Sequence, residues 1–200
     1  MSDAETSVAM RLAEPGTPYD PHRHRRRSIR LPHHDYGGGL YFVTICTHGR
    51  VLLFGDIVDG VMRPNTFGSI VWEEWMRTEE IRTEVVLDAF VVMPNHIHGI
   101  IGIVDGATIT DGVGAHGRAP LRCGIACRRP KSLGAFVAGF KSAVTKRINT
   151  MRGTPSGKVW QRNYWERVLR DERELHIARR YVRDNPLRWH LDRCHPDHIG

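Results

Sequence analysis

Two histidines separated by one residue have the types and spacing that could do chemistry in this chain. His96, Ile97 and His98 lie in an apolar run that predicts a β-strand. Residues i and i+2 of a strand point to the same side of the sheet. Two neutral imidazoles side by side can donate nitrogen lone pairs to a divalent cation. A His-x-His pair is also common on half-exposed strands, so it predicts only half of a metal site.

A second candidate pair lies on a predicted helix further along the sequence. Tyr181 and Asn185 are spaced i, i+4, so they can share one helical face. A phenol beside an amide oxygen suits a nucleophile next to a metal ligand. Each residue also has an ordinary interpretation, because Asn185 fits the end of a helix before Pro186 and Tyr181 fits a half-buried aromatic.

The elements that must position these residues follow from the hydrophobic pattern. Strands are predicted at 40–47, 85–93 and 96–104, a short strand and loop at 159–169, and helices at about 67–81, 133–151 and 171–184. A small hairpin is expected from 51–54 and 57–62, with turns at Gly55-Asp56 and Asp59-Gly60. Asn65 or Thr66 can cap the first helix and Ser132 the second. This order predicts an α+β, ferredoxin-like (RRM-like) βαββαβ sheet with an added C-terminal helix.

The rest of the chain is predicted to lie around that domain. Residues 1–35 are interpreted as a basic, flexible N-terminal tail, residues 36–192 as the domain, and residues 193–200 as a C-terminal tail. Within the domain, the Gly-, Thr- and Arg-rich stretch 105–130 predicts a mobile loop of unusual length.

The charge of the chain favours a polyanionic partner. Lys and Arg number 29 and Asp and Glu 22, which gives a net charge of +7. The excess gathers in residues 21–34, with five Arg, four His and no acid, and in residues 158–193, with ten Lys or Arg against six acids. Clustered cations favour nucleic acid, since each neutralised phosphate releases counterions. Charge for solubility plus a solvated basic arm is the alternative interpretation.

Composition excludes several other classes. Hydrophobic residues make up 40% of the chain, enough for a core, and no apolar run approaches the ~18–20 residues that span a bilayer. The first sixteen residues carry acids and no sustained apolar stretch, so they predict no secretory signal. Four cysteines are too few for a disulfide scaffold, and Cys123-x-x-x-Cys127 has poor zinc spacing. Reduced thiols and a cytoplasmic protein, nucleoid-associated when bound to DNA, are expected.

Three segments together resemble a known enzyme family. They are YFVTICTHGR (41–50), VVMPNHIHGIIGI (91–103) and WQRNYWERVLRDERELHIARRYVRDNPLRW (160–189). The chain resembles the single-tyrosine HUH transposases, and most of all their REP-associated tyrosine transposase branch, from about Arg27 to Asp192. Met-Pro-Asn-His-Ile-His with a downstream Tyr-x-x-x-Asn-Pro is a specific combination. Members of this family have a ferredoxin-like core, in agreement with the element order.

The resemblance implies a role for each candidate residue. His96 and His98 would hold a divalent metal, Tyr181 would be the nucleophile, and Asn185 would be the third protein ligand. The tyrosine would attack single-stranded DNA folded as an imperfect hairpin, form a 5′-phosphotyrosine and release a 3′ hydroxyl, which later reverses the step. This is the chemistry of DNA transposition, and a REP-associated member is typically a monomer, although relatives dimerise and act in trans.

Chemistry supports these residue types. A phenol with a pKa near 10 is protonated at neutral pH and needs help, and a cation polarises the scissile phosphate. Oxygen-rich completion of the metal shell favours Mg²⁺ or Mn²⁺, and two nitrogens tilt the choice toward Mn²⁺. The phosphotyrosine conserves bond energy and the chain has no Walker-type loop, so no nucleotide cofactor is expected.

Further residues are predicted to contact DNA. Trp160, Tyr164 and Trp165 alternate with Arg162 and Arg167, as in a stacking and phosphate-binding surface, although at least one tryptophan, Trp165, is expected in the core. The remaining candidates are Lys141, which can reach phosphate or instead extend along the surface, and Arg25, Arg26 and Arg27 of the tail.

Two functions from other classes stay open at this point. One is a catalytically idle, ferredoxin-like DNA-binding module or repressor derived from a transposase. The other is a metal-dependent nuclease that uses water and forms no protein–DNA adduct. Only the strand transferase requires a metal at His96 and His98 with Tyr181 beside it.

Overall fold

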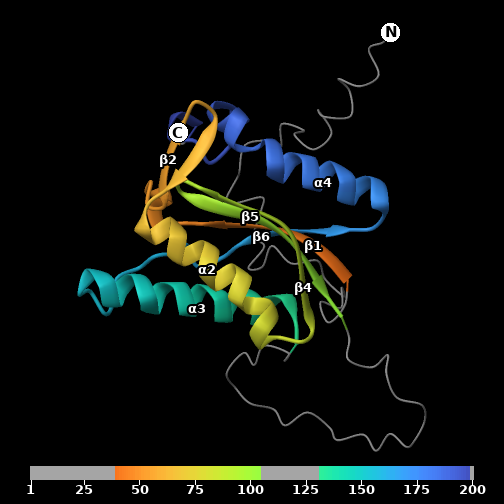
Figure 1. Cartoon of the computed structure of the whole chain (residues 1–200), viewed down its shortest axis with the longest axis horizontal. Helices are drawn as coiled ribbons and strands as arrows, with labels where there is room; N and C mark the ends of the chain where they lie inside the picture. Colours follow the sequence, from red (N-terminus) through yellow and green to blue (C-terminus); the bar gives the residue numbers. More distant parts are fainter. Residues whose placement is uncertain (1–38, 105–130, 199–200) are drawn as a thin grey trace, which may run out of the picture. The chain divides into compact units, whose positions relative to one another are not determined.

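The structure is a computed structural model. Its central element is a four-stranded antiparallel sheet (Figure 1). The structure describes residues 39–104 and 131–198. The predicted tail, the predicted loop at 105–130, Arg25, Arg26, Arg27 and the Cys123–Cys127 pair all lie outside the described residues.

The strand order matches the predicted split βαβ arrangement. The strands run β4-β5-β1-β6 across the sheet, and every neighbouring pair is antiparallel. Their bounds are Gly39–Cys46 for β1, Val85–Met93 for β4, His96–Ile103 for β5 and Trp165–Leu169 for β6. With the helices α2, Thr66–Ile81, and α3, Leu133–Arg152, the order along the chain is β-α-β-β-α-β, and the helix α4, Glu172–Asp184, follows. The predicted α+β, ferredoxin-like fold is confirmed.

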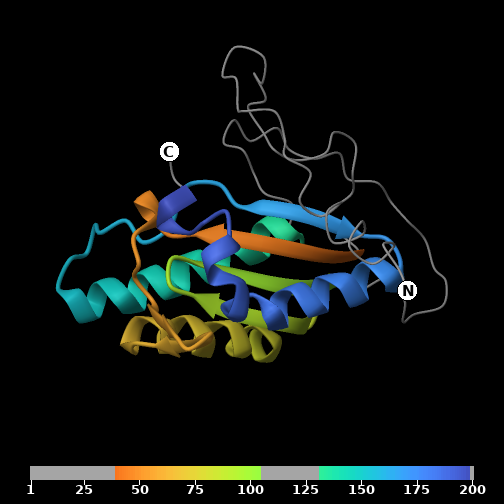
Figure 2. The same cartoon turned by 90° about the horizontal axis from the view of Figure 1, so that it is seen from above.

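The sheet has a helical layer on each face. Helices α2 and α3 cover one face, and α4 lies across the other (Figure 2). The larger core lies under α2 and α3, where Trp75 is fully buried and stacks on Phe90 with ring centroids 4.2 Å apart. A smaller cluster under α4 contains Ile100, Leu169, Ala178 and Val182. Because β5 is covered on both faces, its residues after His98 are all isoleucine or glycine and do not alternate with polar ones.

Side-chain caps begin each helix. The Asn65 side chain accepts from the backbone N–H groups of Phe67 and Gly68, and the Ser132 hydroxyl accepts from Ala135. The Asp171 carboxylate accepts from the N–H of Glu174, where a negative charge also suits the positive end of α4. The predicted caps Asn65 and Ser132 are confirmed. In the part of the chain that the structure describes, no helix is long and apolar enough to cross a membrane.

The predicted hairpin is shifted along the chain. Strand β2, Gly55–Val58, pairs with β3, Val61–Pro64, around the expected Asp59-Gly60 turn. The expected strand at 51–54 and the turn at Gly55-Asp56 were wrong. The N–H groups of Leu53 and Phe54 both donate to the Pro94 carbonyl, and the Phe54 ring is buried, so this segment docks on the turn between β4 and β5.

The two tryptophans near β6 exchange their expected places. The expectation that Trp165 belongs to the core was wrong, because it is 57% exposed, whereas Trp160 is 8% exposed. Trp160 packs between Phe54 and Phe140, with ring centroids at 5.1 and 5.9 Å. Trp165 begins β6, and α4 covers Leu169 at the other end of that strand.

Candidate active site

His96 and His98 converge at the start of β5. Both imidazoles are buried, and their Nε2 atoms are 2.9 Å apart. They lie on the α4 face of the sheet, since His98 pairs with Thr44 and stacks on Phe42, a residue of the cluster under α4. Strand alternation therefore brings the two ring nitrogens to one point.

Hydrogen bonds at the other ring nitrogens fix the orientation of both imidazoles. His96 Nδ1 lies 2.8 Å from the Asn95 side-chain oxygen. The Asn95 amide nitrogen donates to the carbonyls of Arg50 and Cys194, so its oxygen faces His96 and must accept. His96 therefore carries its proton on Nδ1 and a lone pair on Nε2. His98 Nδ1 lies 2.8 Å from the Thr44 hydroxyl, which can donate or accept.

The surroundings keep His96 neutral. Burial, followed by the neighbouring His98, lowers the pKa of His96 well below its usual value, although Asp192 acts in the opposite direction. A neutral imidazole with its lone pair on Nε2 is the form that binds a metal ion.

Helix α4 brings Tyr181 to the histidines. The Tyr181 ring meets the His98 ring edge-on at 5.1 Å and the Phe42 ring at 5.7 Å. The side chain is 40% exposed. Its hydroxyl donates to the Asp192 carboxylate at 3.3 Å.

Asn185 lies one turn beyond Tyr181 and contacts the same carboxylate. Its amide nitrogen donates to Asp192 Oδ2 at 3.0 Å. Its side-chain oxygen is buried and has no hydrogen-bond partner among the described residues. A buried acceptor without a partner is costly, which makes this oxygen the natural place for a cation.

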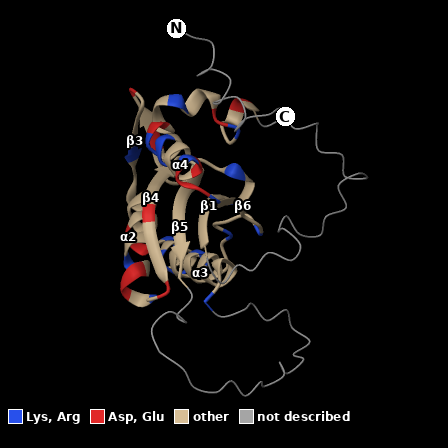
Figure 3. Ribbon diagram, turned by 90° about the vertical axis from the view of Figure 1, so that its right-hand side faces the viewer, with Lys and Arg blue, Asp and Glu red and all other residues tan. Residues whose placement is uncertain are grey.

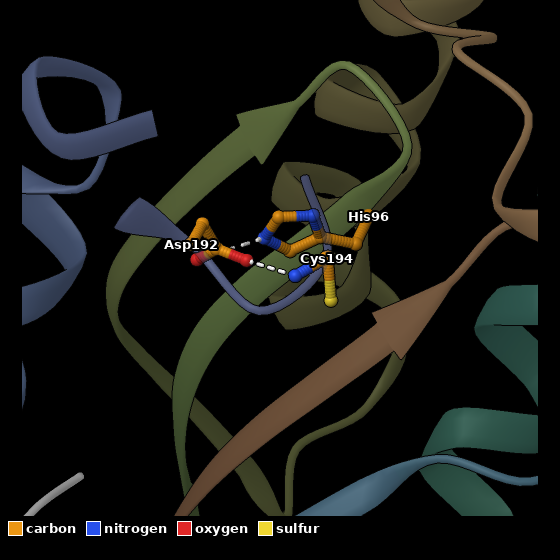
Figure 4. Close-up of side chains that lie close together, drawn as sticks. All are labelled: His96, Asp192 and Cys194. Atoms are coloured by element: carbon orange, nitrogen blue, oxygen red, sulfur yellow. Dashed lines mark hydrogen bonds and ion pairs between the residues drawn. The ribbon is translucent and has the colours of Figure 1, made fainter. Parts of the chain in front are cut away.

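Asp192 is the centre of the cluster, and sequence reasoning missed it as a site residue. Its Oδ2 atom lies 3.6 Å from His98 Nε2. The same Oδ2 lies 3.9 Å from His96 Nε2, while Oδ1 accepts from the Cys194 N–H at 2.6 Å (Figure 4). The 3₁₀ segment Pro186–Leu191 follows α4 and turns the chain back to the histidines. Asp192 lies outside the motifs that indicated the other site residues. Its place in the site depends on the 3₁₀ turn, which the sequence pattern does not predict.

The surroundings shift the pKa values of Asp192 and Tyr181 in opposite directions. Burial alone would raise the pKa of Asp192, but the interaction with His98 and the hydrogen bond from Asn185 hold it well below its usual range. Asp192 is therefore a carboxylate. Burial, then the charge of Asp192 and the hydrogen bond to it, raise the pKa of Tyr181 above its usual value. The phenol is protonated unless positive charge reaches the cluster.

Two thiols border the same cluster. Cys194 Sγ lies 3.7 Å from Cys46 Sγ, and neither of these two cysteines forms a disulfide. One ligand atom from each of His96, Asp192 and Cys194 falls within 4.8 Å of the others (Figure 4). These residues form a group that could hold a metal ion.

The remaining predicted DNA contacts belong to α3, β6 and the loop before β6, and not to the cluster around Asp192. Lys141 belongs to α3, on the opposite face of the sheet, and its ammonium donates to the carbonyls of Gln161 and Asn163 at 2.7 and 2.9 Å. Arg162 is exposed beside this loop, and Tyr164 packs partly against the core. Arg167 pairs with Glu174 at 2.9 Å. Because Trp160 is buried, its ring faces are not available for stacking on a base.

Comparison with known proteins gives this arrangement a context. No protein-family model matches the chain. An uncharacterized protein of Haemophilus influenzae (strain ATCC 51907 / DSM 11121 / KW20 / Rd) is 35% identical over 187 residues, which cover 90% of this chain and 99% of that protein. The chain belongs to the same family as this protein.

A solved structure shows which fold this family has. The structure of a REP-associated tyrosine transposase bound to a REP hairpin superposes with a TM-score of 0.51 and 16% identity, over 83% of this chain and 76% of that one. The chain shares the REP-associated tyrosine transposase fold. The fold expected from the resemblance to the single-tyrosine HUH transposases is thereby confirmed.

Proposed function

We propose that this transposase-fold protein cleaves and rejoins single-stranded DNA with a divalent metal, through a 5′-phosphotyrosine on Tyr181. One observation carries the proposal. The Tyr181 hydroxyl, the Asn185 amide and the two histidine Nε2 atoms all surround Asp192 Oδ2, although they come from a strand and a helix far apart in sequence.

The residues fit a divalent cation. His96 presents a neutral Nε2, Asp192 supplies a carboxylate, and the buried oxygen of Asn185 has no other partner in the described part of the chain. We propose His96, His98 and Asn185 as ligands, with Asp192 as a fourth. Nitrogen and oxygen donors suit Mn²⁺ or Mg²⁺. When bound, the cation would polarise the scissile phosphate and stabilise its developing negative charge.

The chain's own groups then have defined tasks. Asp192 orients the Tyr181 hydroxyl, and the Phe42 and His98 rings hold the phenol in place. The Tyr181 oxygen forms a bond to the phosphorus, the bond from phosphorus to the 3′ oxygen breaks, and the phenol proton passes to water. The departing 3′ oxygen takes a proton from water. Attack by a 3′ hydroxyl on the phosphotyrosine reverses these changes.

The proposed partner is DNA with a hairpin. The superposed REP-associated transposase is bound to a REP hairpin, and this chain carries a net charge of +7. We propose Arg162, Tyr164, Arg167 and the tail residues Arg25, Arg26 and Arg27 as DNA contacts. Lys141 is proposed to support the loop that carries Arg162, because it donates to the carbonyls on either side of it.

Removal of divalent metal tests the proposal directly. Hairpin oligonucleotides taken from repeats beside the native gene are incubated with the protein and Mn²⁺ or Mg²⁺, then run on a denaturing gel. We expect a slow, protease-sensitive adduct that disappears with a chelator and returns when metal is restored.

Other outcomes of this assay identify the rival functions. Cleavage without an adduct indicates a nuclease that uses water. Binding without cleavage or adduct, on a substrate that a relative cuts, indicates a catalytically idle DNA-binding module. An adduct that forms at the full rate in the presence of the chelator would contradict the proposed requirement for a divalent metal.

A single hydroxyl tests the metal site itself. Thr44→Val removes the group bonded to His98 Nδ1 while nearly keeping the side-chain shape. We expect Mn²⁺ affinity to fall by about 10- to 100-fold, because such supporting hydrogen bonds orient a ligand imidazole. Isothermal titration calorimetry measures the change. Thr150→Val is the matched control, since it removes a hydroxyl bonded to the Lys146 carbonyl on the surface of α3. Equal losses in the two variants would contradict the assignment.

A further inference from the structure

A row of paired residues leads across the sheet from the candidate site to an exposed indole. His98 on β5 lies opposite Thr44 on β1, and Thr44 lies opposite Trp165 on β6. Directly paired residues of antiparallel strands have their side chains on the same face. Trp165 therefore lies on the face that carries His98 and Tyr181, two strands away from the histidine.

The separation between His98 and Trp165 suits a nucleotide a few positions from the reacting phosphate. Adjacent strands are about 4.8 Å apart, so the backbones of His98 and Trp165 are separated by roughly 10 Å. A stacked nucleic-acid strand rises roughly 3.4 Å per nucleotide, so a base about three nucleotides from the phosphate at the site would reach the indole.

Helix α4 leaves this end of β6 uncovered. The helix packs over Leu169, at the far end of the strand, whereas Trp165 remains 57% exposed. Arg167 shares the face two residues along the strand, and its guanidinium is held by Glu174 at 2.9 Å. An exposed aromatic ring on the same face as a cation is the combination that binds single-stranded nucleic acid by stacking and charge.

We infer that Trp165 is a base-stacking subsite for an unpaired nucleotide flanking the scissile phosphate. This inference rests on the proposed function. It assigns to Trp165 the recognition of the single-stranded flank, while the hairpin stem is held elsewhere. Stacking tolerates every base, so the indole would position the strand without reading its sequence.

The experiment separates flank binding from hairpin binding. Tyr181→Phe protein is titrated with a fluorescent hairpin that carries its unpaired flank, with the same hairpin lacking the flank, and with flanks carrying one abasic site at each position in turn. Adding Trp165→Ala should weaken binding of the flanked hairpin about 5- to 150-fold, the range of one lost stacking contact. Binding of the bare hairpin should not change, and Trp165→Phe should restore most of the loss.

Trp72→Ala is the matched control. Trp72 is also an exposed tryptophan, at 49%, but it lies on α2, which covers the opposite face of the sheet. Acidic side chains line α2, as Figure 3 shows in red, which disfavours contact with DNA. This variant should bind both hairpins as the parent protein does.

The abasic flanks identify the stacked base. At one abasic position, adding Trp165→Ala should cause no further loss of affinity, because the base that stacks on the indole is already missing there.

The outcomes distinguish this inference from the proposed function. If the unmodified protein forms the metal-dependent adduct but Trp165→Ala binds the flanked hairpin normally, the subsite is wrong and the chemistry stands. An equal loss on the bare hairpin also overturns the subsite. If the unmodified protein forms no adduct and binds neither hairpin, the proposed function fails, and the subsite fails with it.

Discussion

Tyr181→Phe should abolish the covalent protein–DNA adduct, with a loss of at least about a thousandfold in its rate of formation. The substitution removes one oxygen atom and leaves the ring against His98 and Phe42. Since that oxygen is the proposed nucleophile, no other atom of the side chain can form the phosphotyrosine. Mn²⁺ binding and hairpin binding should persist, because the proposed metal ligands and cationic residues are untouched. Denaturing gels measure the adduct, and calorimetry measures the two affinities.

Tyr41→Phe provides the matched control for this loss. It also removes a phenol oxygen, but Tyr41 is buried in the core under α2 and α3. Its adduct should form at the normal rate in protein that remains folded. An undiminished adduct in Tyr181→Phe would show that another residue is the nucleophile. Cleavage that survives in Tyr181→Phe without any adduct would point to attack by water.

His96→Ala should remove both metal binding and adduct formation. His96 offers a neutral, oriented Nε2 that shares its surroundings with His98 Nε2 and Asp192 Oδ2. Removing a metal ligand should lower Mn²⁺ affinity more than removing a hydrogen bond that orients a ligand, as in Thr44→Val. We therefore expect Mn²⁺ affinity to fall by more than about 100-fold. Calorimetry with Mn²⁺ gives this number, and the gel assay reports the adduct at saturating metal.

The buried position of His96 calls for two controls. Because the substitution leaves a cavity beside Asn95, thermal unfolding without metal must show that the variant is folded. His176→Ala removes an exposed imidazole on α4 and should change neither metal binding nor the adduct. Mn²⁺ affinity at the level of the unmodified protein in His96→Ala would rule out the site.

The parts of the site that lie on regular elements could be predicted from the sequence. Strand alternation places His96 and His98 on one face, and helical spacing brings Tyr181 and Asn185 to the same carboxylate. Asp192 could not be predicted in this way, because it follows a 3₁₀ segment that meets the site through Trp189, whose ring centroid lies 5.8 Å from that of His96.

The errors in the fold have the same physical origin. Segment 51–54 is apolar and β-branched at its start, but Leu53 and Phe54 donate to the Pro94 carbonyl and not to a neighbouring strand. The aromatic residues near β6 have no clear period, so the sequence could not tell the buried Trp160 from the exposed Trp165. Tertiary contacts decided both cases.

The Asn95 side chain links the stability of the C-terminal segment to the affinity of the site. One amide orients His96 and also donates to the carbonyls of Arg50 and Cys194, and Cys194 lies two residues beyond Asp192 in the chain. A ligand bound by His96 and Asp192 therefore stabilises the docked conformation of residues 192–198 by RT ln(1 + [L]/Kd). A change that detaches this segment weakens ligand binding by the same free energy. Hydrogen exchange and proteolysis of residues 192–198 would thus report occupancy of a site whose histidines lie about a hundred residues earlier in the chain.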